Sequence, residues 1–499
     1  MAIANILPMI TRIKIDGFKS LIDTQLYFGP FTCIIGANAI GKSNFFDALV
    51  FLSNLADKTL IEAAKSVRSE KQNSSIKDIF FRDGDMSYDT MSFEVDMIIP
   101  KEGYDDLGQK AYASTTAVRY KLQLQATNNS ELDEPIQILS ESLVPIPIKE
   151  IRKQLYFEPT KDWISSVIKG RRSSPFISDK DGSLIKLHLD TGGIENINID
   201  KQEKRKRSGR PLEFQREKMP RTLLSTVTAE SPTAFLVRQE MRDWMMLQLE
   251  PSALRQPNTI YEVKNAEIKA NGANIPATLY RLGNENPDRD IYQEVTNKVT
   301  DLIPNVSELW VDRDDKRDLL TLETKFRNGL TLPAQSLSDG TLRFLGLVIL
   351  QADSANNGVI CLEEPENGIN PKKINAMTNL LQEIATDTNF AVDADNPLRQ
   401  VIINTHSTIV ASDIPYKDLY FADSKQIYHE YFSRKILITA FSALPFTWRG
   451  EHKLAELTNI GDIESYVDGK RGCLSEQYVP PVKRKREKTL RDLELSLFQ

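Results

Sequence analysis

Cysteine is scarce in this sequence, and the few cysteines show no spacing that carries chemistry. Cys33, Cys361 and Cys473 lie far apart among 499 residues, with no CxxC pair and no Cys/His cluster. Such spacing argues against a disulfide framework and a structural zinc site, and it fits a reducing compartment. We therefore expect a cytoplasmic protein.

Long apolar runs are also missing. No stretch approaches the roughly 18 apolar residues that a membrane-spanning helix needs. The longest candidate, ILITAFSAL at 436–444, is too short. The start, MAIANILPMITRIK, lacks the basic and apolar regions of a signal peptide. The sequence therefore predicts no contact with a membrane.

The chain has no large excess of one charge. Its formal net charge is −6, so nucleic-acid binding would need local basic patches. Two segments are basic, 201–221 (KQEKRKRSGRPLEFQREKMPR) and 483–488 (KRKREK). Each is either a solvated segment or a contact to a DNA or RNA backbone, and aromatic residues for base stacking are scarce there. The tail at 478–499 is either solvated or a docking helix for a partner.

Hydrophobic patterning predicts an α/β protein. Apolar runs of strand type alternate with helical patterns, which indicates a parallel sheet covered on both faces. The predicted strands are 9–16, a strand before the glycines of 36–41, 91–98, 117–125, 318–326, 358–364 and 400–407. The predicted helices are 43–57, 231–254, 291–303 and 341–352.

Residues 36–44, GANAIGKSN, match the phosphate-loop pattern GxxxxGK[ST]. The strand before them and the helix after them are the context that this pattern requires. Gly36 and Gly41 let backbone N–H groups face phosphate oxygens, and Lys42 supplies a charge to the β and γ phosphates. Ser43 offers its hydroxyl to Mg²⁺. The stretch therefore predicts a nucleoside-triphosphate site.

The stretch VICLEEPENG (359–368) is an apolar strand that ends in two adjacent carboxylates. Glu363 can hold Mg²⁺, because hard cations prefer oxygen ligands. Glu364 can orient and deprotonate an attacking water. A buried strand that simply ends in surface acids would look the same in isolation. Beside a phosphate loop, we expect the catalytic pair.

Two shorter motifs follow the same logic. LSDGT (337–341) precedes a helix expected from about Leu342, where Ser338 and Gly340 would form an anion site with backbone donors. THS (405–407) ends a buried strand and places His406 where it could donate to a γ-phosphate. Alone, the first would be an ordinary helix cap and the second an incidental histidine.

Taken in order, five motifs resemble the RecF/SMC-like branch of the ABC ATPases, and most closely the OLD-like AAA ATPases of bacteria. They are IKIDGFKSL, GANAIGKSN, LSDGTLRFLGL, LEEPENGINP and QVIINTHS, within about 9–130 and 290–425. The resemblance implies an α/β ABC-type ATPase head with a mixed and parallel sheet, flanking helices and a mainly helical insertion between its halves. The expected parts are an N-terminal lobe at 1–130, an insertion at 131–290, a C-terminal lobe at 291–425 and an extension with a basic tail at 426–499.

In this family, two heads sandwich two ATP molecules, and each site takes its signature serine from the other subunit. The resemblance therefore implies a homodimer or higher homo-oligomer in which Ser338 and Gly340 act across the interface. It implies catalytic roles for Lys42, Glu364 and His406, Mg²⁺ ligation by Ser43 and Glu363, and ATP binding by Gly36, Asn38, Gly41, Lys42, Ser43, Asn44, Ser338 and Gly340.

Three positions depart from the family pattern or leave it incomplete. Ala39 stands where many relatives have glycine. Glu363 replaces the usual aspartate, so the distance to the metal must adjust. No residue of the Q-loop is identifiable, although Arg82 lies in about the right region.

The resemblance implies an ATPase that acts as a nucleotide-driven sensor or switch. It would control a separately encoded effector, expected to be a nuclease, in anti-phage defence systems such as Septu or PARIS. The alternatives are a DNA repair or recombination ATPase acting on DNA ends and a scaffold held together by ATP. A self-contained OLD-type nuclease is disfavoured because only 93 residues follow His406, and a transporter ATPase because 295 positions separate Ser43 from Ser338.

Overall fold

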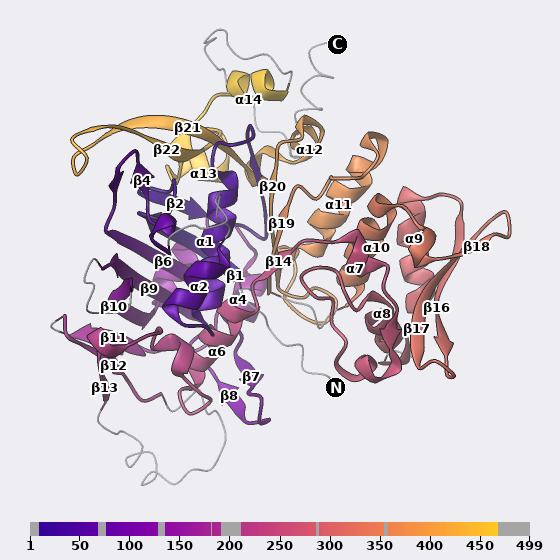
Figure 1. The fold of residues 1–499 in the computed structure, drawn as a ribbon, viewed down its shortest axis with the longest axis horizontal. Helices are drawn as coiled ribbons and strands as arrows, with labels where there is room; N and C mark the ends of the chain where they lie inside the picture. Colours follow the sequence, from indigo (N-terminus) through magenta and orange to yellow (C-terminus); the bar gives the residue numbers. More distant parts are fainter. Residues whose placement is uncertain are drawn as a thin grey trace.

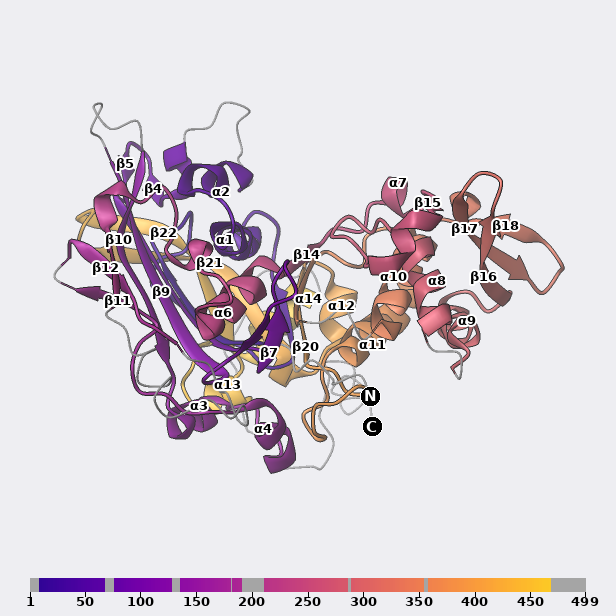
Figure 2. The same ribbon diagram turned by 90° about the horizontal axis from the view of Figure 1, so that it is seen from below.

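The structure is a computed structural model that describes residues 9–67, 76–127, 135–180, 182–190, 211–285, 289–353 and 358–467. Figures 1 and 2 show two parts side by side, a larger one built around two sheets and a smaller one that contains residues 258–333. No helix in the described ranges is long and apolar enough to cross a bilayer. The expected segments 201–210 and 478–499, which include the basic cluster 483–488, lie outside these ranges.

A seven-stranded sheet forms the centre of the larger part. In spatial order its strands are β14 (Met245–Leu247), β19 (Gly358–Glu363), β20 (Arg399–Thr405), β3 (Phe31–Ile35), β21 (Leu419–His429), β22 (Arg434–Ala443) and β23 (Glu456–Leu457). The first five are parallel, while β21 and β22 form an antiparallel hairpin. Because parallel strands end at the same edge, the segments that follow β3, β14, β19 and β20 meet there.

An eight-stranded sheet, antiparallel throughout, lies beside it. Its strands in spatial order are β13 (Leu212–Gln215), β12 (Leu184–Leu187), β11 (Ile177–Lys180), β10 (Ile136–Pro145), β9 (Ala117–Ala126), β6 (Thr90–Ile98), β1 (Met9–Asp16) and β2 (Thr24–Tyr27). Two short hairpins accompany the sheet, formed by β4 (Arg82–Asp83) with β5 (Met86–Ser87) and by β7 (Glu102–Tyr104) with β8 (Lys110–Tyr112).

The smaller part contains a third sheet, in which β17 (Leu319–Phe326) pairs with β15 (Asn258–Thr259), β16 (Val306–Asp314) and β18 (Thr331–Pro333). Helices α8 (Ile275–Glu285) and α9 (Ile291–Leu302) pack against this sheet. Helix α10 (Asp339–Ala352) contacts both helices and so connects this part to the seven-stranded sheet through the strand that follows it.

The remaining helices cover the sheets and the connections between them. The α-helices are α1 (Lys42–Leu55), α2 (Leu60–Ser66), α3 (Ile148–Gln154), α4 (Lys161–Val167), α6 (Pro232–Arg242), α7 (Pro251–Leu254), α11 (Ile374–Ile384), α12 (Thr408–Asp413), α13 (Trp448–Glu451) and α14 (Ile460–Val467). The 3-10 helices are η1 (Ile76–Ile79), η2 (Arg216–Lys218), η3 (Leu224–Thr226), η4 (Ile260–Asn265), η5 (Ala334–Ser336), η6 (Pro371–Lys373) and η7 (Tyr416–Asp418).

The two main sheets are held together by helix α1. Its Phe45 and Phe46 share one apolar core with Ile34 of β3 and with the inner face of the antiparallel sheet. The neighbouring residues Cys33 and Ile35 face a second core, formed with helices α8 to α12. Strand β3 is therefore buried on both faces, as its continuous apolar run predicts. This burial holds the loop after β3 on a rigid support.

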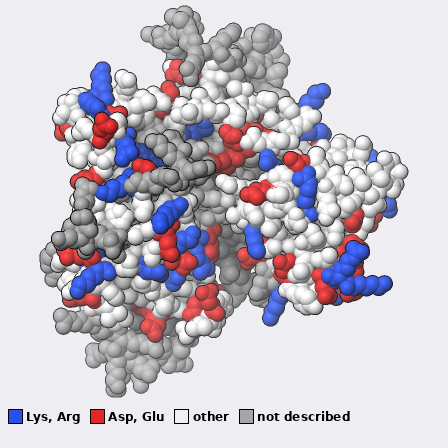
Figure 3. Space-filling model, viewed as in Figure 1, with Lys and Arg blue, Asp and Glu red and all other residues white. Residues whose placement is uncertain are grey.

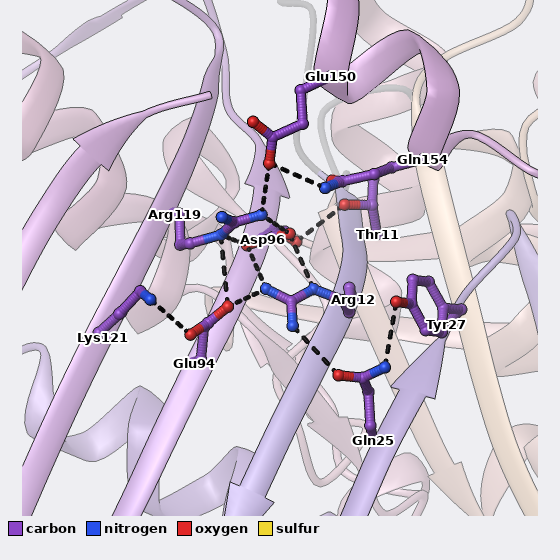
Figure 4. A network of polar contacts seen from close by, with 10 residues as sticks. All are labelled: Thr11, Arg12, Gln25, Tyr27, Glu94, Asp96, Arg119, Lys121, Glu150 and Gln154. Carbon is purple, nitrogen blue, oxygen red and sulfur yellow. Dashed lines mark hydrogen bonds and ion pairs between the residues drawn. The ribbon is translucent and has the colours of Figure 1, made fainter. Parts of the chain in front are cut away.

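A network of three cationic and three anionic side chains lies on the other face of the antiparallel sheet (Figure 4). Its members are Arg12, Arg119, Lys121, Glu94, Asp96 and Glu150. Asp96 is fully buried and accepts hydrogen bonds from Arg12 Nε at 2.9 Å and from Arg119 Nε at 2.6 Å. Because the charges balance within the network, their burial is compensated.

Most predicted elements are confirmed, including the strands at 9–16 and 91–98 and the helix at 291–303. The prediction of one helix over 231–254 is wrong in its second half. Helix α6 ends at Arg242, and Met245–Leu247 pair in parallel with β19. The conformation of so short an apolar run depends on the elements that it contacts. Here the run pairs with the edge of β19 and therefore forms a strand.

The structure adds strands to the expected insertion at 131–290, which also contains helices. Strands β10 to β13 extend the antiparallel sheet of the N-terminal lobe. At the other end, the expected boundary at residue 425 falls inside β21, and the hairpin that follows belongs to the seven-stranded sheet. The described part of the C-terminal extension is thus integrated into the fold that carries the phosphate loop.

Candidate nucleotide-binding site

The phosphate loop connects β3 to α1 in a conformation that requires its glycines. A Cβ at Gly36 would meet the main-chain oxygen of Ala422 at 2.4 Å, and one at Gly41 would meet Thr439 Oγ1 at 2.1 Å. Gly41 also has a φ of 96°, which disfavours other residues. Ala39 has a φ of 63°, so the alanine at this position adopts the left-handed conformation that glycine would take more easily.

Lys42 is folded back onto its own loop. Its Nζ donates to the main-chain oxygens of Gly36 and Ala37, each at 2.7 Å. Burial lowers the pKa of Lys42, and the nearby carboxylates Glu364 and Glu363 offset part of this effect. The ammonium group is therefore held in the loop by neutral acceptors, which a phosphate can replace.

The floor of the loop is built from two distant segments. Asn44 Nδ2 donates to Ser20 Oγ at 2.7 Å, and Ser20 Oγ lies 2.6 Å from Thr439 Oγ1. Thr439 Oγ1 in turn donates to the main-chain oxygen of Ile40 at 2.8 Å. The side chain of Asn44, predicted to bind the nucleotide, thus supports the loop through Ser20 in this structure.

Glu363 and Glu364 follow β19 at the same edge of the sheet. Asn404 of β20 donates from its Nδ2 to Glu363 Oε1 at 3.1 Å. The main-chain N–H of Glu364 donates to the oxygen of Asn404 at 2.9 Å, and Glu364 has a positive φ of 46°. The chain turns after β19, and the two adjacent carboxylates both line the cavity at this edge of the sheet.

Glu364 and His406 are in direct contact. The Nδ1 of His406 lies 2.7 Å from Glu364 Oε1, and Asn367 Nδ2 donates to Glu364 Oε2 at 2.9 Å. Burial raises the pKa of Glu364, but the hydrogen bonds from Asn367 and His406 lower it more, so the net pKa lies below the ordinary value. Glu364 is therefore ionised at neutral pH and able to accept a proton.

These elements surround one cavity of about 660 Å³, within the range of small-ligand sites. The predicted residues that line it are Asn38, Gly41, Lys42, Ser43, Asn44, Glu363 and Glu364. Gly36 and His406 adjoin the cavity through Lys42 and Glu364. Its opposite wall comes from the segment 247–251 and from Arg343 and Leu347 of α10.

Ser338 and Gly340 lie at the start of helix α10, outside the set of described residues that line this cavity. Ser338 is the N-cap, and its Oγ accepts a hydrogen bond from the N–H of Thr341 at 3.3 Å. The helix therefore begins at Asp339, two to three residues before the predicted start at 341–342. A Cβ at Gly340 would meet the main-chain oxygen of Gly368 at 2.2 Å, so glycine permits α10 to pack on the loop after Glu364.

Sequence reasoning missed several residues of the site. Gln248 follows β14 directly and lines the cavity opposite the phosphate loop, whereas Arg82 pairs with Asp78 away from it. Glu366 is buried and is not among the described residues that line the cavity, and burial raises its pKa. No sequence motif marks Gln248, and its place in the site becomes evident only when Met245–Leu247 is known to be a strand of the central sheet.

The donor set fits Mg²⁺ shared with a nucleotide. Among the residues that the structure describes, no group of three or more His, Cys, Asp or Glu side chains is arranged to hold a metal. Ser43 and Glu363 instead offer two oxygen ligands at one cavity. Mg²⁺ is usually bound in this way, by one or two carboxylates together with substrate phosphates and water.

The fold is α/β, and its cavity combines a phosphate-loop motif with two adjacent carboxylates. Two family models match separate stretches of the chain. "AAA ATPase domain" matches residues 9–155, and "AAA domain, putative AbiEii toxin, Type IV TA system" matches residues 229–412. The first contains the phosphate loop and the second contains the signature, the carboxylates and His406. Both matches support an ATPase of the AAA/ABC kind.

Solved structures similar to this chain include heads of SMC proteins. An SMC head bound to the C-terminal winged-helix domain of ScpA has 12% identity and a TM-score of 0.41, with 87% of this chain and 98% of that chain covered. The SMC head domain from Thermotoga maritima has 12% identity and a TM-score of 0.35, with 87% and 98% covered. The search among curated proteins found no match.

Proposed function

We propose that this protein binds ATP with Mg²⁺ and hydrolyses it to ADP and phosphate. The observation that carries the proposal is one cavity lined by Lys42 and Ser43 at the start of α1 and by Glu363 and Glu364 at the end of β19. Phosphate binding, metal binding and proton transfer are the three tasks of this reaction, and the cavity holds a group for each.

Each residue has a role that its surroundings favour. Lys42 would exchange the oxygens of Gly36 and Ala37 for the phosphates, and Ser43 and Glu363 would hold Mg²⁺, which would supply positive charge to the phosphate oxygens. Glu364 accepts a proton from the attacking water. Because an ionised carboxylate can only accept, the Nδ1 of His406 carries the hydrogen between them. His406 thereby orients Glu364.

Glu364→Gln and Lys42→Ala test these roles. We expect Glu364→Gln to bind ATP with wild-type affinity and to hydrolyse it at least a hundredfold more slowly, because the base is removed while the ligand contacts remain. We expect Lys42→Ala to lose binding. Equilibrium titration and a phosphate-release assay measure both. A wild-type hydrolysis rate in Glu364→Gln would disprove the assignment of the base.

We infer further that the active form is an ATP-sandwiched dimer. Ser338 is exposed at the start of α10 and lies apart from the cavity of its own chain. An exposed helix N-terminus with a serine cap is available to phosphates of a nucleotide held by a second copy. Composite sites of this kind make ATP part of the interface, so that hydrolysis releases the dimer.

Light scattering after size exclusion tests the dimer in the Glu364→Gln background. ATP should raise the mass to that of a dimer, and Ser338→Arg should prevent this by placing a bulky side chain at the interface. Ser307→Arg, at an exposed serine of β16, serves as the matched control. An ATP-dependent dimer that persists in Ser338→Arg would contradict the composite site.

We propose that this dimer is a switch that controls a separate effector, with a nuclease in anti-phage defence as the expected case. The resemblance to OLD-like ATPases supports this role, and so does the matched description that names a toxin of a toxin–antitoxin system. On the face drawn in Figure 3, Lys and Arg are interspersed with Asp and Glu, which favours a protein trigger over a nucleic-acid track on that face.

The steady-state ATPase rate with duplex DNA, single-stranded DNA or tRNA tests this choice. An ATPase rate that none of the three nucleic acids changes supports a protein as the trigger. Stimulation by DNA ends would favour the alternative, an ATPase of DNA repair or recombination. Any such stimulation should fall steeply with salt, since backbone contacts release counterions.

A further inference from the structure

The loops after β3 and β20 share a hydroxyl group that comes from the C-terminal extension. Tyr466 of α14 places its hydroxyl 3.1 Å from the main-chain oxygen of Gly36 and 2.7 Å from that of His406. Gly36 begins the phosphate loop, and His406 contacts Glu364. One hydroxyl thus lies between the part of the site that binds phosphate and the part that handles the proton.

The position of this hydroxyl follows from the ends of two neighbouring strands. The parallel pairing of β3 with β20 ends at Ile35 and Thr405. The next residue on each strand, Gly36 or His406, leaves the sheet and has a carbonyl without a ladder partner. The Tyr466 hydroxyl supplies a donor at the point where the ladder stops, to the buried carbonyl of Gly36 and to the exposed carbonyl of His406.

Tyr466 is held in place independently of its hydroxyl. Its ring packs edge-on against Phe421 with centroids 5.9 Å apart, and Phe421 pairs with Ile35. Helix α14 also packs on α12, which follows His406. Burial raises the pKa of Tyr466 to about 12, so the hydroxyl keeps its proton at neutral pH. The side chain is a fixed donor.

A hydroxyl has one proton and can donate fully to only one of the two carbonyls. In this structure Lys42 already donates to the Gly36 oxygen, and the shorter Tyr466 distance is to the His406 oxygen. When Lys42 moves to a phosphate, the Gly36 oxygen loses that donor, and Tyr466 is within reach to replace it. The His406 carbonyl is then released.

We propose that Tyr466 is a positioning residue that couples phosphate occupancy at Lys42 to the placement of His406 on Glu364. This inference rests on the proposed ATPase function and adds to it a control element from the C-terminal extension. The coupling requires no contact between Tyr466 and the nucleotide, because it acts through two main-chain carbonyls. Displacement of α14 would therefore change hydrolysis more than binding.

Tyr466→Phe tests the coupling, because it keeps the ring and removes the proton. We expect kcat to fall about five- to tenfold with KM within about twofold, the size of one lost hydrogen bond. In a His406→Ala background the same change should alter kcat less than about twofold, since residues that act through one another are not additive. The matched control is Tyr420→Phe, which removes a hydroxyl bonded to the main chain of Tyr27 and should leave kcat unchanged in both backgrounds.

A second measurement does not depend on turnover. In Glu364→Gln, bound ATP should change hydrogen exchange in the peptide that spans 400–413, and Tyr466→Phe should at least halve that change while ATP affinity stays the same. An equal loss of kcat with and without His406 would overturn the coupling, and so would a rise in KM alone. If the wild type binds ATP without hydrolysing it, the ATPase proposal fails and the exchange experiment alone decides the coupling.

Discussion

Charged side chains are arranged in opposite ways in the antiparallel sheet and at the nucleotide site. Asp96 accepts hydrogen bonds from two guanidinium groups, those of Arg12 and Arg119, and the network around it is balanced. At the site, Lys42 donates to the neutral carbonyls of Gly36 and Ala37. Paired charges specify the sheet, whereas the site keeps charges ready for a ligand. We therefore expect substitutions in the network to change mainly the stability of the fold, and substitutions at the site to change mainly ligand binding and hydrolysis.

The largest effect should come from breaking the paired network. Asp96→Asn keeps the shape but removes the charge that faces Arg12 and Arg119, and we expect a loss of about 3–5 kcal/mol in the free energy of unfolding. Chemical denaturation measures this loss. The control is Asp23→Asn, at an exposed ion pair with Lys14, which should cost less than about 1 kcal/mol. Equal losses in the two variants would contradict the comparison.

Removing the Lys42 side chain should have the opposite effect, a large loss of ATP binding with little change in the free energy of unfolding. We expect Lys42→Ala to weaken ATP binding more than a hundredfold, while the free energy of unfolding changes by less than about 1 kcal/mol. The lost hydrogen bonds to Gly36 and Ala37 are offset by relief from burying an ammonium group. Calorimetric titration and denaturation measure the two quantities. The control is Lys65→Ala, at an exposed lysine of α2, which should change neither quantity. A large loss of stability in Lys42→Ala would show that Lys42 mainly stabilises the fold.

The smallest effect concerns acid stability. Burial raises the pKa of Glu94, but Lys121 and Arg12 lower it more, to about 2. A carboxylate with a depressed pKa stabilises the fold above its unfolded pKa, and this contribution is lost as pH falls from about 4.5 to about 2. Solvent screening limits it to roughly 1 kcal/mol.

Denaturation curves of wild type and Glu94→Gln across this pH range test the assignment. The variant should be less stable at pH 7, and the difference should shrink as the pH falls toward 2 and vanish below it, where Glu94 is protonated in both the folded and the unfolded state. A constant difference at every pH would mean that the contribution of Glu94 is not electrostatic.

Local patterns were sufficient for much of the fold. The strand at 9–16, the helix after the phosphate loop and the strands that end at Glu363 and Thr405 follow from periodicity and from turn residues. The segment Met245–Leu247 was predicted as the continuation of a helix over 231–254, and a run of three apolar residues carries no period that distinguishes helix from strand. Its parallel pairing with β19 decides its conformation, and this pairing joins residues more than a hundred positions apart.

The sequence by itself determined which groups are available to the proposed chemistry, since GANAIGKSN, LEEPENG and THS carry the groups that we propose for phosphate, metal and proton in motifs a few residues long. Only the tertiary structure decided which other residues join them. Gln248, Thr439 and Tyr466 reach the site from segments without a motif. The physical reason is the parallel sheet, whose strands come from distant parts of the chain and end at one edge, so that neighbours there are set by strand order rather than by sequence.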